Sequence, residues 1–429
     1  MFNKKINSID DVVQYQLCTG CGACAFVEPL RFEMDDDLDI GRRPFLKEDA
    51  VAESGKALTA CPGANLTHEF DRNSKELIPE LIDGWGPANN VWEGYSAIPA
   101  IRHGGSSGGA ATALSVFAIE KKGFAGVLHT NANKNIPYLN ETVFSRTRDD
   151  LQSTTGSRYA PASPCDGLGK IMQENGPSVF IGKPCDVAAV HKARIQNPEL
   201  NEKVGLTIAF FCAGTPSTQG TLDLLKEMGI EDPTKVKSLR YRGNGWPGRW
   251  TAVYHDADDT EKMASLTYAE SWGFLQKYRQ WRCYICPDHT GEFADIAVGD
   301  PWYREVEPDE SGKSLIVART ESGRKFVLEA EKAGYIKLEK NEASLLPKSQ
   351  PNILVSRGNV WPRIIILRLL GAAIPTYTGF VFLRFWLKKL NWTEKRQSIL
   401  GTIIRVFRKN LRHRIKIMRQ TQTKIYRDR

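Results

Sequence analysis

Eight of the nine cysteines in this 429-residue chain fall into two sets of four, and the first set has the spacing of an iron–sulfur site. Its members are Cys18, Cys21, Cys24 and Cys61, the last of which precedes a proline. Three cysteines at intervals of three residues, followed by a distant Cys-Pro, are typical of ferredoxin-type loops that bind a 4Fe-4S cluster. Gly20 and Gly22 allow the tight turn that such a loop requires. These residue types and their spacing predict electron transfer.

Structural zinc and disulfide bonds are the alternative uses of the first set, and both fit the pattern less well. Zinc sites usually pair two CxxC units or include histidine. Disulfides need an oxidising compartment, whereas the first residues contain no apolar segment of the kind that directs export, so we expect a cytoplasmic protein. In compact two-cluster ferredoxins the Cys-Pro cysteine serves the other cluster. Because this chain has one CxxCxxC, Cys61 most simply completes the same cluster.

The second set of cysteines lies beside predicted strands, and its members are Cys185, Cys212, Cys283 and Cys286. The first two follow apolar segments at 178–182 and 204–211, and the CxxC pair precedes a third predicted strand at 293–298. Sites in open α/β sheets gather outside the carboxyl ends of strands, so these four could converge on a second cluster. Alternatively, the first two are small buried residues and the CxxC is a separate redox pair. We expect the ninth cysteine, Cys165, to be a free, uninvolved thiol.

The alternation of apolar segments with amphipathic helices predicts an α/β fold. The helices predicted at 186–196 and 218–228 follow the strands predicted at 178–182 and 204–211, respectively. We expect three parts along the chain: a small cluster-binding unit over residues 1–85, a larger α/β domain over 86–350, and a basic tail over 351–429.

A glycine-rich segment at 104–109, before a predicted helix at 110–122 and a predicted strand at 124–128, could receive a phosphate. Glycines at a helix N-terminus offer free N–H groups to an anion. No clear strand precedes the segment, so it is no Rossmann fingerprint, and a serine N-cap with flexible glycines also explains it. A second polar segment at 154–159 suits a pyrophosphate and a stacked ring, or an ordinary loop.

Between about residues 15 and 305 the ordered motifs resemble those of the coenzyme F420 hydrogenase/dehydrogenase beta-subunit family. They are CTGCGAC, CPG, SSGGAATAL, TTGSRY, IGKPCDVAAV, FFCAGTPS, RYRGNGWPG, CYIC and ADIAVGDPW. The family includes the flavin-binding subunits of deazaflavin-reducing hydrogenases and a reductase of 7-hydroxymethyl chlorophyll. The resemblance implies an α/β fold with an N-terminal ferredoxin-like unit, an FAD, and one or two 4Fe-4S clusters. It also implies a ferredoxin or partner subunit as the electron donor.

The resemblance implies roles for individual residues as well. It assigns each cysteine set to a 4Fe-4S cluster, and it assigns FAD binding to Ser106, Ser107, Gly108, Gly109, Thr112, Thr155, Ser157, Arg158, Tyr159 and Lys183. Arg158 stands where the family has lysine, which keeps the charge but alters the donor geometry.

Three residues are candidates for catalysis. Lys183 and Asp300 match family positions that line the flavin or substrate cavity, and Pro301 replaces a phenylalanine common there, so we expect a reshaped cavity wall. His191 lies about one turn into the helix predicted from residue 186 and could donate a proton, although a lone helical histidine is more often structural.

The C-terminal tail is strongly basic. Residues 352–429 carry 18 Lys and Arg against two acidic residues, a net charge of +16, so the remainder carries −8. The longest uncharged stretch, 369–383, is shorter than the roughly 20 apolar residues that span a bilayer. Apolar residues at three- and four-residue spacing over 399–418, with Arg and Lys opposite, predict a basic amphipathic helix on an anionic membrane surface. Alternatively, this helix packs on the acidic body.

We therefore expect an iron–sulfur flavoprotein oxidoreductase that takes electrons from a ferredoxin-like donor through clusters to FAD and then to an organic substrate. Clusters pass single electrons and a flavin delivers two, so such a chain converts between one- and two-electron chemistry. We expect the reductase direction. The tail suggests a lipid-linked or sugar substrate. The alternatives are an electron-transfer component of a larger complex and a deazaflavin-dependent reductase or dehydrogenase. We expect peripheral attachment to the inner face of the membrane. We expect no nucleic-acid partner. The sequence also allows a homo-oligomer.

Overall fold

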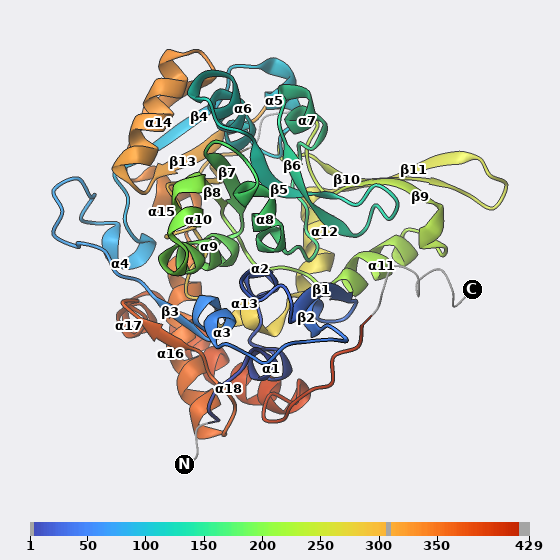
Figure 1. Ribbon diagram of the computed structural model, residues 1–429, viewed down its shortest axis with the longest axis vertical. Coiled ribbons are helices and arrows are strands. Elements are labelled where there is room, and N and C mark those ends of the chain that lie inside the picture. The colour runs from blue at the N-terminus through green and yellow to red at the C-terminus, as the bar shows by residue number, and fades with distance from the viewer. Residues whose placement is uncertain (1–3, 306–309, 420–429) are drawn as a thin grey trace.

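The computed structural model describes residues 4–305 and 310–419, and an eight-stranded mixed sheet forms its centre (Figure 1). Its strand order is β14-β4-β13-β12-β8-β7-β5-β6. The four parallel strands are β5 (Val127–Ala132), β7 (Ser178–Gly182), β8 (Val204–Phe210) and β12 (Ile296–Gly299). The antiparallel outer strands are β4 (Asn90–Ser96), β6 (Asn140–Ser145), β13 (Ser314–Ala318) and β14 (Ile336–Asn341). The carboxyl ends of the parallel strands therefore share one edge of the sheet.

Helices cover both faces of the sheet because apolar residues occupy both sides of its parallel strands. Val179 and Ile181 of β7 pack with α6 (Ala110–Lys122) and α14 (Glu321–Lys332). Phe180 points to the opposite face and packs with α8 (Leu168–Met172) and α9 (Pro184–Gln196). The remaining short helices of this part are α5 (Pro99–Gly104), α7 (Arg148–Ser153), α10 (Pro198–Lys203) and α15 (Leu345–Ser349).

A separate three-stranded antiparallel sheet lies beside the central one. Its strands, in the order β11-β10-β9, are β9 (Val236–Arg240), β10 (Arg249–His255) and β11 (Glu261–Thr267). With α11 (Thr218–Glu227) and α12 (Tyr268–Leu275) it encloses a core that includes the fully buried Trp250. The β10–β11 hairpin extends outward in Figure 1. The chain then returns through α13 (Trp281–Tyr284), which leads into the CxxC pair.

The N-terminal cysteines lie in a small unit at the lower end of Figure 1. Its elements are α1 (Ile9–Gln14), α2 (Ala23–Val27), β1 (Phe32–Asp37), β2 (Gly41–Leu46), α3 (Lys56–Ala60) and β3 (Asn65–Thr67), followed by α4 (Ile82–Trp85). β1 and β2 form an antiparallel hairpin.

The C-terminal helices pack against this N-terminal unit, although more than 250 residues separate them in sequence (Figure 1). They are α16 (Ile353–Leu369), α17 (Leu383–Lys389) and α18 (Trp392–Arg408), and β15 (Thr376–Thr378) pairs in parallel with β3. Leu367 and Val406 are fully buried in one core with Val12 and Cys18. Packing on the body, one of the two arrangements predicted for the tail, is therefore present. Among the described residues no helix is both long and apolar enough to cross a bilayer.

The structure confirms the α/β class and several predicted elements. β7 and α6 have the bounds predicted from sequence, β8 ends one residue before 211, and α11 ends one residue before 228. α9 begins at Pro184, two residues earlier than predicted, because proline fits the first helical turn.

Other predicted elements differ from the structure. The strand predicted at 293–298 begins only at Ile296, because the Asp288 carboxylate accepts N–H groups from residues 290–292 and holds a turn there. The strand predicted at 124–128 begins at Val127. A strand, β4, does precede the glycine-rich segment, but α5 separates the two.

The helix predicted over 399–418 is wrong in its C-terminal half. α18 ends at Arg408 because Asn410 takes a left-handed conformation, with φ of 52°, and the Leu411 N–H returns to the carbonyl of Val406. The chain beyond runs along the N-terminal unit, where the Ile415 N–H donates to the carbonyl of Gln14 at 3.0 Å.

The shared core predicts a stability difference between two neighbouring leucines of α16. Leu367 is fully buried, whereas Leu369 is 53% exposed. Leu367→Ala should lower the free energy of unfolding by about 2–5 kcal/mol, because it leaves a cavity between the N- and C-terminal segments. Leu369→Ala, the matched control, should change it by less than about 0.5 kcal/mol. Chemical denaturation measures both, and equal effects would contradict the packing described.

Candidate functional site

The four cysteines of the first set line one small cavity in the N-terminal unit. Apolar side chains complete its wall, among them Ile9, Val12 and Met34. Gly20 and Gly22 have φ of 75° and 90°, in the left-handed region, as the predicted tight turn requires. The Gly20 N–H donates to the Cys18 sulfur at 3.3 Å. The loop thus directs its sulfurs inward and provides an N–H donor to one of them.

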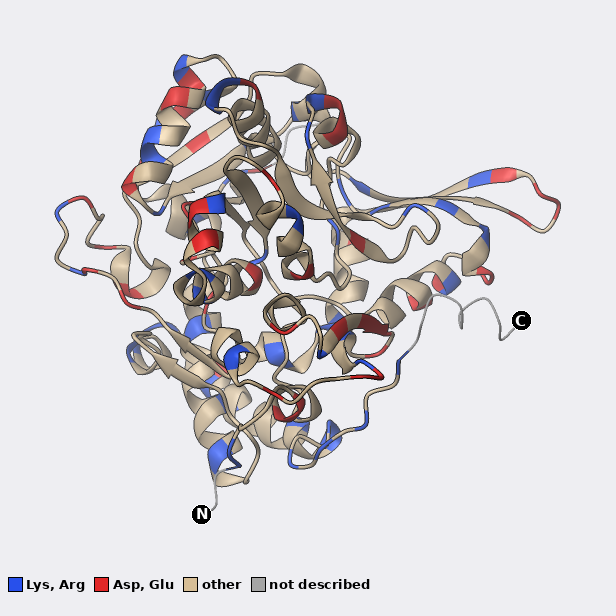
Figure 2. Cartoon of the chain, viewed as in Figure 1, with Lys and Arg blue, Asp and Glu red and all other residues tan. Residues whose placement is uncertain are grey.

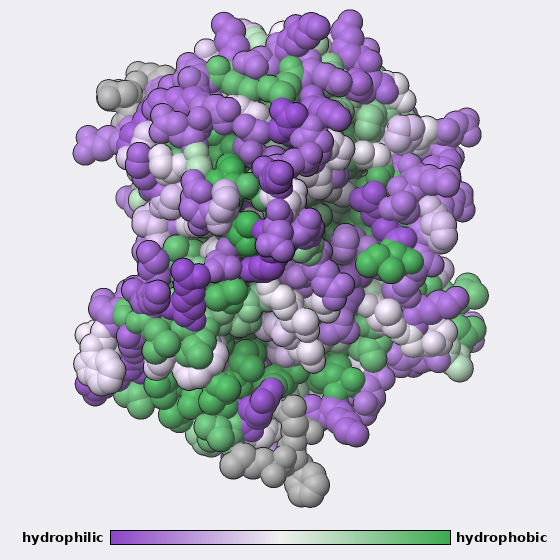
Figure 3. All heavy atoms as spheres, turned by 90° about the vertical axis from the view of Figure 1, so that its left-hand side faces the viewer, coloured by the Kyte–Doolittle hydropathy of each residue, from purple (hydrophilic) through white to green (hydrophobic). Residues whose placement is uncertain are grey.

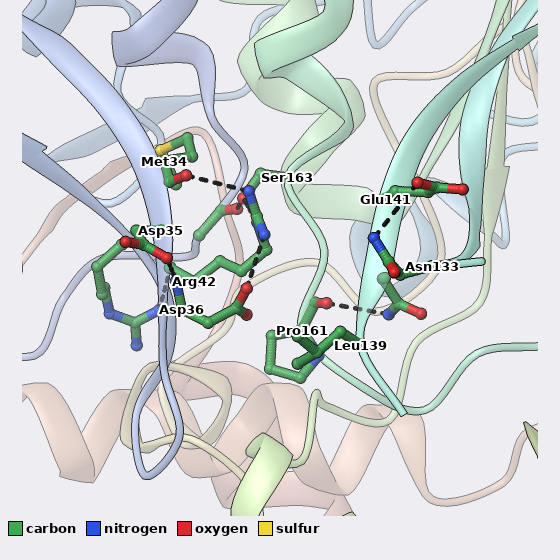
Figure 4. Close-up of polar contacts among 12 residues, drawn as sticks. Met34, Asp35, Asp36, Arg42, Asn133, Leu139, Glu141, Pro161 and Ser163 are labelled. Carbon is green, nitrogen blue, oxygen red and sulfur yellow. Dashed lines mark hydrogen bonds and ion pairs between the residues drawn. The ribbon is translucent and has the colours of Figure 1, made fainter. Parts of the chain in front are cut away.

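Arg42 fastens this cysteine loop to the large domain (Figure 4). Its guanidinium pairs with Asp36 at 2.8 Å within the hairpin and donates to the Ser163 hydroxyl at 3.3 Å across the junction. Ser163 in turn donates to the carbonyl of Gly20 at 2.6 Å. The carbonyl of Pro161, also drawn in Figure 4, accepts from Asn140 at 2.9 Å and anchors the segment that carries Ser163. The loop is therefore held from outside by neutral and charge-assisted hydrogen bonds.

The first set fits a cluster better than a single metal ion. Burial raises the pKa of the Cys61 thiol to about 12 and raises that of Cys18, so positive charge from bound metal is needed to keep them as thiolates. Within residues 4–305 and 310–419, no three His, Cys, Asp or Glu side chains converge closely enough to hold one ion. In a 4Fe-4S cluster each thiolate binds its own iron, so the sulfurs lie farther apart than around zinc.

The second set of cysteines converges at the carboxyl edge of the parallel strands. Cys185 follows β7 and Cys212 follows β8, while α13 carries Cys283. The N–H of Gly214 donates to the Cys212 sulfur and that of Thr215 to the Cys283 sulfur, each at 3.4 Å. Burial raises the pKa of the Cys185 thiol, and the neighbouring sulfurs of Cys212 and Cys286 raise it further. The structure thus brings all four together, and their binding of a second cluster stays a prediction.

Cys165 is a free thiol, but it is not uninvolved as we predicted from the sequence, because it contacts residues of both cysteine sets or directly beside them. It is fully buried, and its N–H donates to the carbonyl of Cys21 at 3.0 Å. Its thiol contacts the Cys21 sulfur, whose pKa this hydrogen bond lowers, and also reaches the carbonyl of Asp186 at 3.4 Å. Asp186 follows Cys185 directly, so the ninth cysteine lies between the two sets.

The two segments expected to hold FAD do meet in space. The Ser157 N–H donates to the Ser106 hydroxyl at 2.6 Å, and Arg240 from β9 donates to the carbonyl of Gly104 at 2.6 Å. Thr155 lies beside the same arginine, 3.4 Å from its guanidinium. The glycine-rich segment, the polar segment and the end of β9 therefore form one junction.

Several of the predicted contacts are already used within the protein. The Gly108 N–H donates to the Ser314 hydroxyl at 3.0 Å, and Ser107 is hydrogen-bonded to the same hydroxyl at 3.1 Å. Arg158 donates to Asn140 and to the carbonyls of residues 137, 139 and 239. Its guanidinium N–H groups are therefore used in contacts within the protein. Gly109 is the N-cap of α6, and Thr112 lies in the first turn of that helix.

Arg242 is a cation of this junction that our reasoning from the sequence did not single out. It is 3% exposed and binds both oxygens of Asp300, at 2.8 and 2.9 Å. It also donates to the Tyr159 hydroxyl at 3.3 Å, and the Trp246 N–H donates to Asp300 at 2.8 Å. The available signal was RYRGNGWPG, which contains Arg242 and Trp246 and was used only for the resemblance.

Stacked aromatic rings extend from this ion pair. Trp246 and Trp302 stack with ring centroids 5.2 Å apart, and Tyr268 lies parallel to Trp302 at 5.6 Å. The guanidinium of Arg242 lies over the Tyr268 ring at 4.6 Å. Flat rings beside a fixed charge suit a planar heterocycle such as a flavin or a deazaflavin.

The three candidate catalytic residues do not form one group. Lys183 pairs with Asp186 at 2.7 Å, next to Cys185, whereas Asp300 pairs with Arg242. His191 is exposed on α9 with its ring against Phe293 at 5.4 Å, and within the described residues it makes no hydrogen bond or ion pair. The structure therefore gives no added support to the prediction that His191 donates a proton.

Fold and site together define a redox protein of mixed α/β architecture, with cysteine sets in its N-terminal unit and at the edge of its sheet. The family model for the N-terminal part of the coenzyme F420 hydrogenase/dehydrogenase beta chain matches residues 91–168. The model for the C-terminal part of the same beta chain matches residues 178–344. The chain therefore belongs to the coenzyme F420 hydrogenase/dehydrogenase beta-subunit family, which confirms the resemblance found in its motifs.

Individual relatives agree with this membership. The F subunit of the F420H2 dehydrogenase of Methanosarcina mazei is 24% identical over 74% of this chain and 83% of its own length. The beta subunit of F420-dependent formate dehydrogenase 1 of Methanococcus maripaludis is 27% identical over 58% of this chain and 61% of its own. A chain from the F420-reducing NiFe hydrogenase complex of Methanosarcina barkeri has a similar fold, with a TM-score of 0.51 and 21% identity over 65% of this chain and 93% of that chain.

The buried ion pair at the junction predicts a large stability effect. Asp300→Asn should lower the free energy of unfolding by about 3–5 kcal/mol, because it leaves the Arg242 charge buried without its partner. The control is Glu329→Gln, which breaks the exposed ion pair with Lys122 and should cost less than about 1 kcal/mol. Denaturant titration of both variants checks this, and a small effect at Asp300 would mean that water or another group replaces the carboxylate.

Proposed function

We propose that the protein is the iron–sulfur electron-transfer component of a deazaflavin-type oxidoreductase complex. The observation that carries the proposal is the presence of two separate four-cysteine sets in a chain of the F420 hydrogenase/dehydrogenase beta-subunit family. The relatives are named as subunits of an F420H2 dehydrogenase and of an F420-dependent formate dehydrogenase, which supports a role within a complex. These names favour this alternative over the reduction of a lipid-linked or sugar substrate.

The first two parts of the chain would bind different cofactors. Residues 1–85 would act as the ferredoxin-like unit, with the first set holding one 4Fe-4S cluster in its apolar cavity. Residues 86–350 would bind FAD and hold the second cluster on Cys185, Cys212, Cys283 and Cys286. When bound, the clusters supply one-electron transfer and FAD supplies the change to two-electron chemistry. The donor would be a ferredoxin or a partner subunit, in the cytoplasm.

The residues at the junction would position the organic groups. Ser106 and the Ser157 N–H, already joined by a hydrogen bond, fix the relative position of the two segments proposed to hold FAD. Arg242, held by Asp300, keeps a positive charge inside the protein: burial disfavours it, but the carboxylate keeps the pKa of the guanidinium above its ordinary value. The stacked rings of Trp246 and Trp302 border the same junction.

Metal analysis of the anaerobically purified chain tests this function. We expect about eight irons, about eight sulfides and one FAD per chain, as two 4Fe-4S clusters and one flavin require. Cys24→Ala and Cys286→Ala should each remove about four irons, because each removes a ligand of a different cluster. Cys165→Ser, the control, keeps a hydrogen-bond donor toward Cys21 and should retain about eight. Zinc without sulfide would overturn the proposal, and absorbance of F420 mixed with the reduced protein would test the deazaflavin assignment.

We also propose that the C-terminal helices attach the protein to an anionic membrane surface. α18 turns Ser398, Thr402 and Val406 toward the protein, whereas Leu400, Ile404 and Phe407 are 45–62% exposed. Trp392 at its start is 82% exposed. The outward face of this helix is therefore its apolar face, which is the reverse of a helix that only covers a core. Figure 3 shows apolar side chains gathered at this end of the molecule.

The charges around this apolar face favour lipid over a neutral protein surface. Exposed cations surround it: Lys388, Lys389, Arg396, Arg408, Lys409 and Arg412. Between residues 352 and 419 the acidic residue is Glu394 alone. Lys and Arg recur along these helices and the segment after them in Figure 2. An apolar face bordered by cations matches an anionic bilayer surface.

Vesicle binding by the full chain tests this attachment. Sedimentation with phosphatidylglycerol vesicles, but not with phosphatidylcholine vesicles, is expected, and it should weaken at high salt. Replacing both Ile404 and Phe407 by serine should weaken binding at least about tenfold, since each buried apolar side chain contributes about 1.5–3 kcal/mol. Ile195→Ser, at a 73% exposed isoleucine on α9, is the matched control. Failure of the unaltered chain to bind phosphatidylglycerol would contradict membrane attachment and leave the face to a protein partner.

A further inference from the structure

Arg282 is a buried cation that has no carboxylate partner in the described part of the chain. It lies in α13 and is 4% exposed. Its guanidinium donates to two backbone carbonyls, of Ile285 at 3.3 Å and of Pro62 at 3.2 Å, and its Nε has no hydrogen-bond partner. An unpaired buried charge is costly, so proteins pair such groups with an opposite charge. The arrangement is therefore incomplete without an anion.

Two other deeply buried arginines have carboxylate partners: Arg242 pairs with Asp300, and Arg357 pairs with Glu292. Arg319, which is 2% exposed, contacts backbone carbonyls instead, as Arg282 does. Arg43 is the second buried arginine near the cysteines, and it too contacts neutral groups, the carbonyl of Arg42 and the Gln280 side chain. Both buried arginines beside the first cysteine set thus contact neutral groups instead of a carboxylate.

The position of Arg282 identifies the anions. It directly precedes Cys283 of the second set, and its guanidinium bonds the carbonyl of Pro62, which follows Cys61 of the first set. The same guanidinium donates to the carbonyl of Ile285 at 3.3 Å, and Ile285 directly precedes Cys286 of the second set. One guanidinium is therefore hydrogen-bonded to the backbone beside a cysteine of each set.

We propose that Arg282 is a positioning cation shared by two iron–sulfur clusters, and that its charge sets the reduction potentials of both. This rests on the proposed function, because it requires both clusters. The two clusters, when bound, would exchange single electrons with no bond formed or broken. The electron adds a negative charge to the receiving cluster, which a nearby fixed positive charge in a poorly solvated interior stabilises. Because the cation borders both clusters, it favours the reduced form of each.

Redox titration followed by electron paramagnetic resonance tests the proposal on the purified, cluster-loaded chain. Arg282→Gln removes the charge while its amide can still donate to the Pro62 carbonyl, and we expect both clusters to become harder to reduce. Arg282→Lys keeps the charge and should return both potentials toward those of the unaltered chain. Arg43→Met is the matched control: its guanidinium borders the Gly20 turn, and its charge acts on Cys18, so it should shift the first cluster alone.

The outcomes separate this inference from the proposed function. Fewer than about eight irons in the unaltered chain would overturn the proposed function itself. Unchanged potentials, or a shift of one cluster only, in an Arg282→Gln protein with full iron content would overturn the shared cation. If that variant does not retain its iron, Arg282→Lys decides instead: potentials near those of the unaltered chain support the role of charge, and a fall of both contradicts it.

Discussion

The parallel pairing of β7, β8 and β12 is the constraint on which the rest of the site depends. Their register places the residues after Gly182, Phe210 and Gly299 at one edge of the sheet. Two cysteines and Asp300 thereby share a neighbourhood, although more than 100 residues separate the first from the last in sequence. Because both faces of these strands are buried under helices, a slip in register would move apolar side chains out of two cores at once. The sheet therefore holds the residues at this edge in fixed relative positions.

The N-terminal unit depends on other parts of the chain for its stability. Its core includes Leu367 and Val406 from the last quarter of the sequence. Its cysteine loop is hydrogen-bonded to Ser163 of the large domain. A unit of this size is only marginally stabilised by its own apolar burial, so these contacts add to its stability. The cysteine loop, the sheet edge and the tail are accordingly one cooperative structure, which fixes the distance between the two cysteine sets.

The sequence predicted the features that depend on residues close together in the chain. The CxxCxxC spacing, the β-branched strand at 178–182 and the helix at 110–122 depend on neighbouring residues, and all appear as expected. Contacts that depend on the tertiary fold were missed. Cys165 looked isolated because its neighbours Cys21 and Asp186 are distant in sequence, and Arg158 looked available although its donors are taken by carbonyls of other strands and loops. The end of α18 depended on a single asparagine, whose left-handed backbone no periodicity records.

The joining of the two chain ends has a consequence for how the protein is made. The ribosome releases Cys18 and Cys24 long before Leu367, Val406 and Leu411, which belong to the same apolar core. Every residue that lines the cavity of the first cysteine set lies within residues 9–61, so the cavity itself can form early in synthesis. The apolar packing behind the cysteine loop is complete only when the last helices have emerged.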